Sequence, residues 1–185
     1  MLSQASQRLV DDHIALDEVL KQLKEMLTAG DIEASHARLD LFWARLAVHI
    51  RAEHLHLFPV VLNRLSDITA GAAGAPTIAE GRTVVDRLRA DHDFFMHELA
   101  QAIGILRDLS KATNGQAIDK GASAVRDAIL EIEKRLVIHN ELEENTIYRW
   151  TTTIPDEREQ TDLANRINAE LANRPERFSL NAWTA

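Results

Sequence analysis

The sequence predicts an all-α protein: an antiparallel, up-and-down four-helix bundle with a short extra helix at its C-terminal end. Glycine and proline are scarce, with 7 and 4 residues in 185, and they gather in a few breaks. The long segments between these breaks are rich in Leu, Ala, Glu, Arg and Lys, which favour helices. Apolar residues recur there at alternating spacings of three and four, as on one face of a helix. Such segments, joined by mostly short connections, are typical of a helix bundle.

Four stripes of apolar residues, each along one face of a predicted helix, follow one another in the chain. They span residues 9–27, 39–60, 85–106 and 125–150. The breaks that separate and follow them lie at residues 28–31, 66–77, 114–115 and 151–155. We therefore predict a bundle domain over residues 1–150.

A shorter helix is predicted after Pro155, because proline suits the first turn of a helix and the acidic residues that follow favour its N-terminus. Its apolar face consists of Leu163, Ile167 and Leu171. Residues 151–185 are thus expected to form a C-terminal helix and an apolar tail. The tail is expected to dock on the bundle, to bind a partner protein or to mediate self-association, and its large apolar residues are Phe178, Leu180 and Trp183.

The composition excludes several classes of function. The chain has no cysteine, so it holds no disulfide, thiolate nucleophile, cysteine zinc site or iron–sulfur cluster. Its 29 acidic and 21 basic side chains give a net charge of −8, which disfavours nucleic acid and anionic membranes as partners. The longest apolar run, residues 57–62, is too short to span a bilayer, and no apolar core near residue 1 indicates a secretory signal. A cytoplasmic location is expected.

Histidine interrupts all four apolar stripes, and in two of them a glutamate follows four residues later. Residues four apart lie on one helix face, so each His-x-x-x-Glu pair points both side chains the same way. His36 lies off its stripe and is predicted to be a solvated surface residue. The polar residues on the stripes are His13, His49, Glu53, His92, His139 and Glu143.

These six residues are expected to meet at one level of the bundle. Counted from the midpoints of the three connections, their heights agree to within about one helical turn, at about 1.5 Å per residue. Carboxylates and imidazoles buried together among leucines are costly unless something neutralises them, and a bound metal does so. Nitrogen and oxygen donors without sulfur suit iron, manganese or zinc, and the two glutamates are placed to bridge two ions.

The pattern resembles the hemerythrin-like family, whose members carry the HHE cation-binding domain, over roughly residues 9–150. The resemblance rests on four motifs: Asp12-His13, His49-x-x-x-Glu53 followed by Leu57-Phe58-Pro59, Asp91-His92, and His139-x-x-x-Glu143-Glu144. It implies a hemerythrin-like bundle with a non-haem di-iron centre bridged by an oxo or hydroxo group. It also implies a role in handling oxygen, nitric oxide, peroxide or iron.

The resemblance further implies a centre with an open coordination position that reacts with or senses O2, nitric oxide or peroxide. Oxygen-carrying members have a further histidine four residues after the one on the third helix, where this chain has Met96. That difference favours turnover or sensing over reversible carriage, and it leaves open whether the chain is an enzyme. The alternative function is an iron-responsive regulatory or scaffold module, in which metal occupancy controls partner binding.

Two positions have alternative interpretations as ligands. His56, one turn beyond Glu53, is a candidate extra ligand or an outer partner. The oxygen carriers space their last carboxylate five residues after its histidine, which selects Glu144. On a helical wheel, however, Glu143 lies about 40° from His139 and Glu144 about 140° away, so Glu143 is preferred.

Other polar residues near the stripes are assigned supporting or structural roles. Asp17 is expected to accept a hydrogen bond from the first histidine and to fix its tautomer. His54 is expected to point away from the centre, and His97 to lie on a flank of its helix. Tyr148 and Trp150 are expected to pack in the core.

Overall fold

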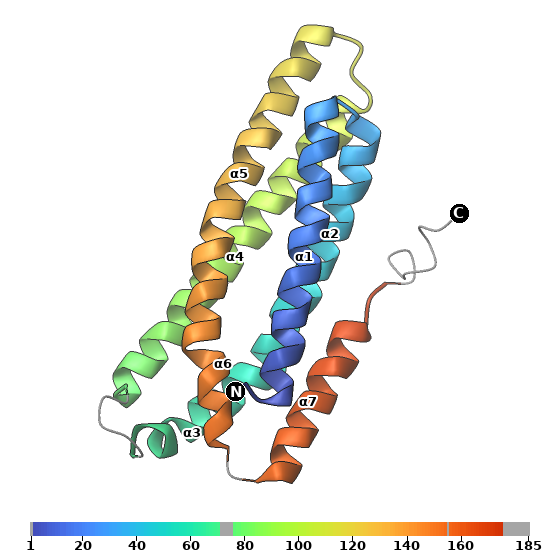
Figure 1. Ribbon diagram of the computed structural model, residues 1–185. Coiled ribbons are helices and arrows are strands. Elements are labelled where there is room, and N and C mark those ends of the chain that lie inside the picture. The colour runs from blue at the N-terminus through green and yellow to red at the C-terminus, as the bar shows by residue number, and fades with distance from the viewer. Residues whose placement is uncertain (1, 71–75, 155, 176–185) are drawn as a thin grey trace.

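The computed structural model describes residues 2–70, 76–154 and 156–175 (Figure 1). Within these ranges the chain is almost entirely helical and forms no β-strand, which confirms the predicted all-α class. The elements are α1 (Gln4–Ala29), α2 (Ile32–Ala52), the π-helix η1 (Glu53–Leu57), α3 (Phe58–Ala70), α4 (Ile78–Leu109), α5 (Gly115–Asn145), α6 (Ile147–Trp150), the 3-10 helix η2 (Thr151–Thr153) and α7 (Glu157–Ala172).

Long helical segments pack side by side in a helical bundle, as Figure 1 shows. α1 lies against α2 and α5, and α4 contacts the same two helices. α2, η1 and α3 follow one another without a break in the helical chain. α7 packs on the outside of the bundle, against α1, α2 and η1.

The helices start and stop largely where the sequence places turn and capping residues. Gly30 ends α1 in the left-handed conformation, with φ of 74°, which glycine adopts at little cost. Asp31 caps the start of α2, and Thr77 starts α4 with a reciprocal capping box. The break predicted over residues 66–77 is shorter than expected, because α3 continues to Ala70 through a stretch without glycine or proline.

A π-turn shifts the phase of the second helical segment just after Glu53. The N–H of Phe58 donates to the carbonyl of Glu53, five residues back, so this turn holds one residue more than an α-helical turn. Pro59 has no N–H and cannot continue the regular pattern, and the π-turn ends next to it. The next buried residue after Glu53 is therefore Leu57. The prediction that the apolar stripe continues through His56 is wrong.

The fourth helical segment has a comparable irregularity just after Glu143. α5 ends two residues later, and Thr146 has φ of −125° and ψ of −83°, outside the helical region. The chain then turns into α6, whose residues Ile147 and Tyr148 are fully buried. The fourth stripe is therefore interrupted at Thr146 and does not continue in one phase to its predicted end.

The hydrophobic core consists of two clusters with a layer of polar side chains between them. One cluster is built from α1, α2, α4 and α5, and the other includes residues of α3, α6 and α7 as well. On α1, for example, Leu16 belongs to the first cluster and Leu9 to the second, with His13 between them. The polar layer is thus enclosed by apolar packing on both sides.

The helix predicted after Pro155 is α7, which is capped by the side chain of Asp156. Its residues Leu163 and Ile167 are buried in the second cluster, as their spacing predicts. The predicted apolar tail with Phe178, Leu180 and Trp183 lies outside the described residues. In the ranges that the structure describes, we find no helix with the length and apolar character needed to cross a membrane.

Candidate metal centre

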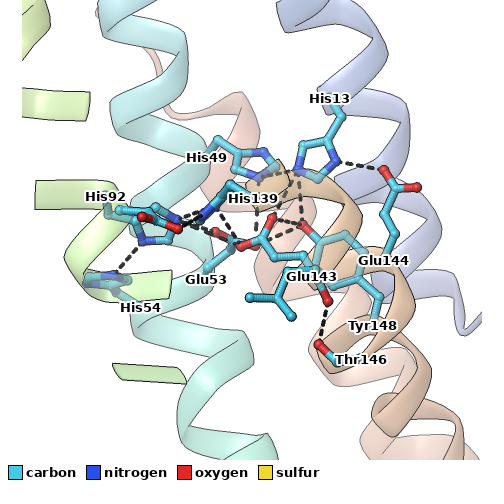
Figure 2. A network of polar contacts seen from close by, with 12 residues as sticks. His13, His49, Glu53, His54, His92, His139, Glu143, Glu144, Thr146 and Tyr148 are labelled. Carbon is cyan, nitrogen blue, oxygen red and sulfur yellow. Dashed lines mark hydrogen bonds and ion pairs between the residues drawn. The ribbon is translucent and has the colours of Figure 1, made fainter. Parts of the chain in front are cut away.

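The polar layer brings together all six residues selected from the stripes (Figure 2). They come from α1, α2, η1, α4 and α5, so that each long helical segment contributes at least one side chain. Neither glutamate exposes any surface, and none of the four histidines exceeds 4%. The six are His13, His49, Glu53, His92, His139 and Glu143.

The four histidines form two pairs whose Nε2 atoms face each other. His13 Nε2 lies 3.1 Å from His49 Nε2, and His92 Nε2 lies 3.0 Å from His139 Nε2. One pair comes from α1 and α2, and the other from α4 and α5. The nitrogen donors are therefore gathered at two positions.

Each glutamate presents one carboxylate oxygen to each histidine pair. Glu53 Oε1 lies 3.7 Å from His49 Nε2, and its Oε2 lies 3.3 Å from His92 Nε2. Glu143 Oε2 lies 3.3 Å from His13 Nε2, and its Oε1 lies 3.1 Å from His139 Nε2. Carboxylates oriented in this way are suited to bridge two cations, one beside each pair.

The donors fit bound metal better than they fit a metal-free polar cluster. Among the described residues, Glu53 Oε2 and Glu143 Oε1 are buried oxygens without a hydrogen-bond partner. Both belong to the group of donors around His92 and His139, whose ligand atoms lie within 4.8 Å of one another. An unsatisfied buried polar group costs about 1–3 kcal/mol, and a bound cation would offset that cost.

Aspartates on α1 and α4 orient histidines on the neighbouring helix. Asp12 Oδ2 lies 3.1 Å from His49 Nδ1, and Asp91 Oδ2 lies 3.3 Å from His139 Nδ1. A carboxylate acceptor at Nδ1 fixes the imidazole tautomer in which Nε2 is free to bind a cation. Each aspartate precedes one candidate ligand in the sequence but supports a different one in space.

His13 and His92 have different partners at their outer nitrogens. Glu144 Oε1 lies 3.0 Å from His13 Nδ1, and His54 Nε2 lies 2.9 Å from His92 Nδ1 (Figure 2). The expectation that His54 points away is wrong, because the π-turn rotates it towards α4. The expectation that Asp17 accepts a hydrogen bond from His13 is also wrong. Glu144, on another helix, is the acceptor at His13 Nδ1.

Tyr148 is a member of the centre that the sequence analysis assigned to core packing. Its hydroxyl donates to Glu53 Oε1 at 2.8 Å, and it lies 3.3 Å from Glu143 Oε2 and 3.2 Å from His13 Nε2. The side chain is fully buried. The irregularity at Thr146 brings it onto the face of Glu143, five residues earlier, which a regular helical wheel places about 140° away.

The remaining histidines lie apart from the candidate ligand groups. His56 faces α7, where its Nε2 lies 3.7 Å from Glu170 Oε2, because the π-turn takes it off the buried face. His97 contacts Gln101 on an exposed face of α4. Neither these two nor His36 belongs to the metal-capable groups found in the described part of the chain.

Burial and neighbouring charges shift the protonation of the cluster in opposite directions. Burial lowers the pKa of His13, but hydrogen bonds with Glu143 and Glu144 outweigh it and raise this pKa to about 10. For His92 burial dominates and lowers the pKa to about 4. Burial and the charge of Glu143 raise the pKa of Glu53, whereas His139 and His13 hold the pKa of Glu143 well below its usual range despite burial.

Loading the metal-free protein with Zn²⁺ is expected to release a proton from His13. This residue must be neutral to bind through Nε2, yet its pKa of about 10 keeps it protonated at pH 7. Competition between Zn²⁺ and this one proton should therefore lower the Zn²⁺ affinity by up to about tenfold for each pH unit below 10. Calorimetric titration in buffers of different ionisation enthalpy measures the release. A proton count of zero would contradict the expectation, and His36→Ala should behave as wild type.

A small cavity adjoins the histidine layer. Its volume is about 10 Å³, enough for about one water molecule. The lining combines imidazoles with apolar side chains and one amide: His13, His49, His92, His139, Leu16, Leu46, Leu136 and Asn140. The space beside the centre is thus suited to a very small ligand.

The chain belongs to the hemerythrin HHE cation-binding domain family. The model of this family matches residues 4–151, which include all six candidate ligands and Tyr148. The recognition made from the sequence motifs is therefore confirmed, together with the expectation of a cation-binding domain. α7 lies beyond the matched residues. Comparisons with curated proteins and with solved structures gave no match.

Proposed function

We propose that the chain binds two iron ions, one at each histidine pair, and that this centre reacts with or senses O2, nitric oxide or peroxide. The observation that carries the proposal is that Glu53 and Glu143 each present one oxygen to each pair. The proposal includes an antiparallel, up-and-down order of the four long helical segments, which brings their histidines to one level. Manganese and zinc are the alternatives for the same donors.

The surroundings of the centre support a small substrate. A pair of iron ions would supply one-electron chemistry and a place for a small ligand. The chain's own residues hold the donors between two apolar clusters and away from bulk water. The cavity beside the histidines, about 10 Å³ in volume, has no room for a larger molecule without rearrangement.

Metal analysis combined with an optical spectrum tests this function. Protein purified in air is expected to contain two iron ions per chain and to show oxo-iron charge-transfer absorption that changes on addition of peroxide or nitric oxide. Iron present without any spectral response would contradict the proposed reactivity. Absence of iron, manganese and zinc from protein purified in air, and failure to take them up from solution, would contradict the centre itself.

One contact favours the second candidate function, an iron-responsive regulatory module. Arg174, just after α7, has its Nη2 3.6 Å from Asp12 Oδ1, and Asp12 holds His49. Arg51 on α2 forms an ion pair with Glu170 on α7. The C-terminal helix is thus linked to the outer side of one histidine pair, so that occupancy of the centre can influence its docking.

Hydrogen exchange tests this second function. Removing metal is expected to increase amide exchange in α7 more than in the far half of α5, because His49, the partner of Asp12, would no longer be held in place by an ion. Arg174→Gln should reduce that difference, whereas Arg166→Gln, at an exposed position within α7, should not. Equal exchange of α7 with and without metal would exclude control of the helix by metal.

A further inference from the structure

The centre is built from two halves related by an internal repeat of sequence. An arginine, a histidine, a glutamate, its neighbour and an aromatic residue recur at the same spacing in both halves. They are Arg45, His49, Glu53, His54 and Phe58 in one half, and Arg135, His139, Glu143, Glu144 and Tyr148 in the other. The halves therefore differ chemically at two positions near the donors, where histidine replaces glutamate and phenylalanine replaces tyrosine.

The two aromatic residues occupy equivalent places in the structure. Tyr148 stacks on His13 with ring centroids 5.7 Å apart and an interplanar angle of 25°. Phe58 stacks on His92 at 6.0 Å and 9°. Each ring thus covers one histidine of one pair, but Tyr148 alone brings an oxygen donor with it.

The hydroxyl of Tyr148 lies at the spacing expected of a further donor around the ion position of His13 and His49. It is 3.2 Å from His13 Nε2, 2.8 Å from Glu53 Oε1 and 3.3 Å from Glu143 Oε2. Neighbouring donors around a cation with bonds of about 2.1 Å lie about 3 Å apart. The metal-capable group at this position consists of His13, His49 and Glu143, and the Tyr148 oxygen extends it to four donors.

The group around His92 and His139 takes its four donors from these two histidines, Glu53 and Glu143, and Phe58 adds none to it. The partner at the outer nitrogen of His92, Nδ1, is the imidazole of His54, which carries no negative charge. At His13 the corresponding partner is the carboxylate of Glu144. Glu144 and Tyr148 thus place oxygen atoms beside His13, where His92 has only the rings of His54 and Phe58, and hard oxygen ligands suit ions of high charge.

We infer that the two ion positions are unequal, and that Tyr148 is a ligand which makes the His13–His49 position the tighter site for a trivalent iron ion. The His92–His139 position is then the weaker one, with a place left for an exchangeable ligand. This inference rests on the proposed function. Ligation breaks the O–H bond of Tyr148 and forms an oxygen–iron bond, and the proton is released to solvent without any transfer of electrons.

The chain offers a sharp spectroscopic test, because Tyr148 is its only tyrosine. Metal-free protein is titrated with ferric citrate and followed by visible absorption and resonance Raman scattering. We expect tyrosinate–iron signals to develop with the first ion bound and to gain little with the second. Tyr148→Phe, which copies the other half of the repeat, should abolish these signals and weaken the first binding step by on the order of 10–100-fold, while the second step changes little.

Two further variants complete the design. Phe58→Tyr should add a tyrosinate signal at the second ion and bring the two binding steps closer together, and His36→Ala should leave both steps unchanged. Two ions bound by wild type without tyrosinate signals, or signals that grow equally with both ions, would overturn the inference and leave the proposed function intact. A protein that binds no iron would overturn the proposed function itself. Thermal melts of the metal-free variants show whether each one is folded.

Discussion

Replacing Glu53 or Glu143 with alanine is expected to reduce the metal content from two ions per chain to one or none. Each glutamate presents an oxygen to both histidine pairs, so its loss removes a donor from each ion position at once. The remaining carboxylate cannot compensate, because it already faces both positions. Elemental analysis after dialysis against excess iron measures the stoichiometry.

Two controls separate loss of the bridge from loss of the fold. Glu141→Ala removes an exposed carboxylate from α5, two residues before Glu143, and should retain two ions. Glu53→Gln keeps the size of the side chain, and burial and the charge of Glu143 already raise the pKa of Glu53. The glutamine variant should therefore fold well without metal and still fail to hold two ions. Two ions retained in both alanine variants would refute the bridging role.

His92→Leu is expected to have opposite effects on thermal stability with and without metal. Burial lowers the pKa of His92 to about 4, so at pH 7 the imidazole is neutral in the metal-free protein. Leucine continues the apolar stripe of Leu88 and Phe95, and what it removes from His54, His139 and Glu53 is a neutral partner. The melting temperature of the metal-free protein should therefore stay level or rise.

With metal bound, the same change removes a ligand, and the binding energy coupled to folding is lost with it. Each tenfold loss of affinity is about 1.4 kcal/mol. About 1 kcal/mol shifts the melting temperature of a chain of this size by about 2–4 °C. A fall of several degrees is thus expected in the loaded protein only. Melts of wild type and His92→Leu, each with and without chelator, supply the comparison.

His139→Leu is the matched contrast. Burial lowers the pKa of His139, but Glu143, Glu53 and Asp91 outweigh burial and raise it, and the imidazole is the partner of the Glu143 and Asp91 carboxylates in the metal-free protein. Leucine would leave them buried without that partner, which destabilises a fold strongly. This variant should therefore melt lower than wild type in both states. Destabilisation of both variants to the same extent with and without metal would mean that the cluster is an ordinary polar core without a metal site.

The sequence by itself determined the helical class and the six residues of the polar layer. Apolar periodicity is a property of each helix alone, and it holds wherever the helix is regular. Up to Glu53 and up to Glu143 the segments are regular α-helices. A histidine or glutamate on the apolar face of such a helix is therefore turned inward whatever the neighbouring helices are.

The positions that the sequence misplaced lie close behind the two glutamates. The π-turn after Glu53 and the break at Thr146 change the rotation per residue, so a wheel drawn with a constant angle fails for His54, His56 and Tyr148. The two irregularities have an equivalent effect, since each brings an aromatic residue five positions later onto the glutamate face. Periodicity carries no signal for them, although Pro59 marks the first.

Only the tertiary structure decided which side chains support the ligands. Asp12 reaches His49, and Glu144 reaches His13, across the space between neighbouring helices. These pairings depend on the rotation and relative height of two packed helices, to within about an ångström for a hydrogen bond. Spacing along one chain sets height only to about a turn, which is enough to gather six candidate ligands in one layer and too coarse to assign their partners.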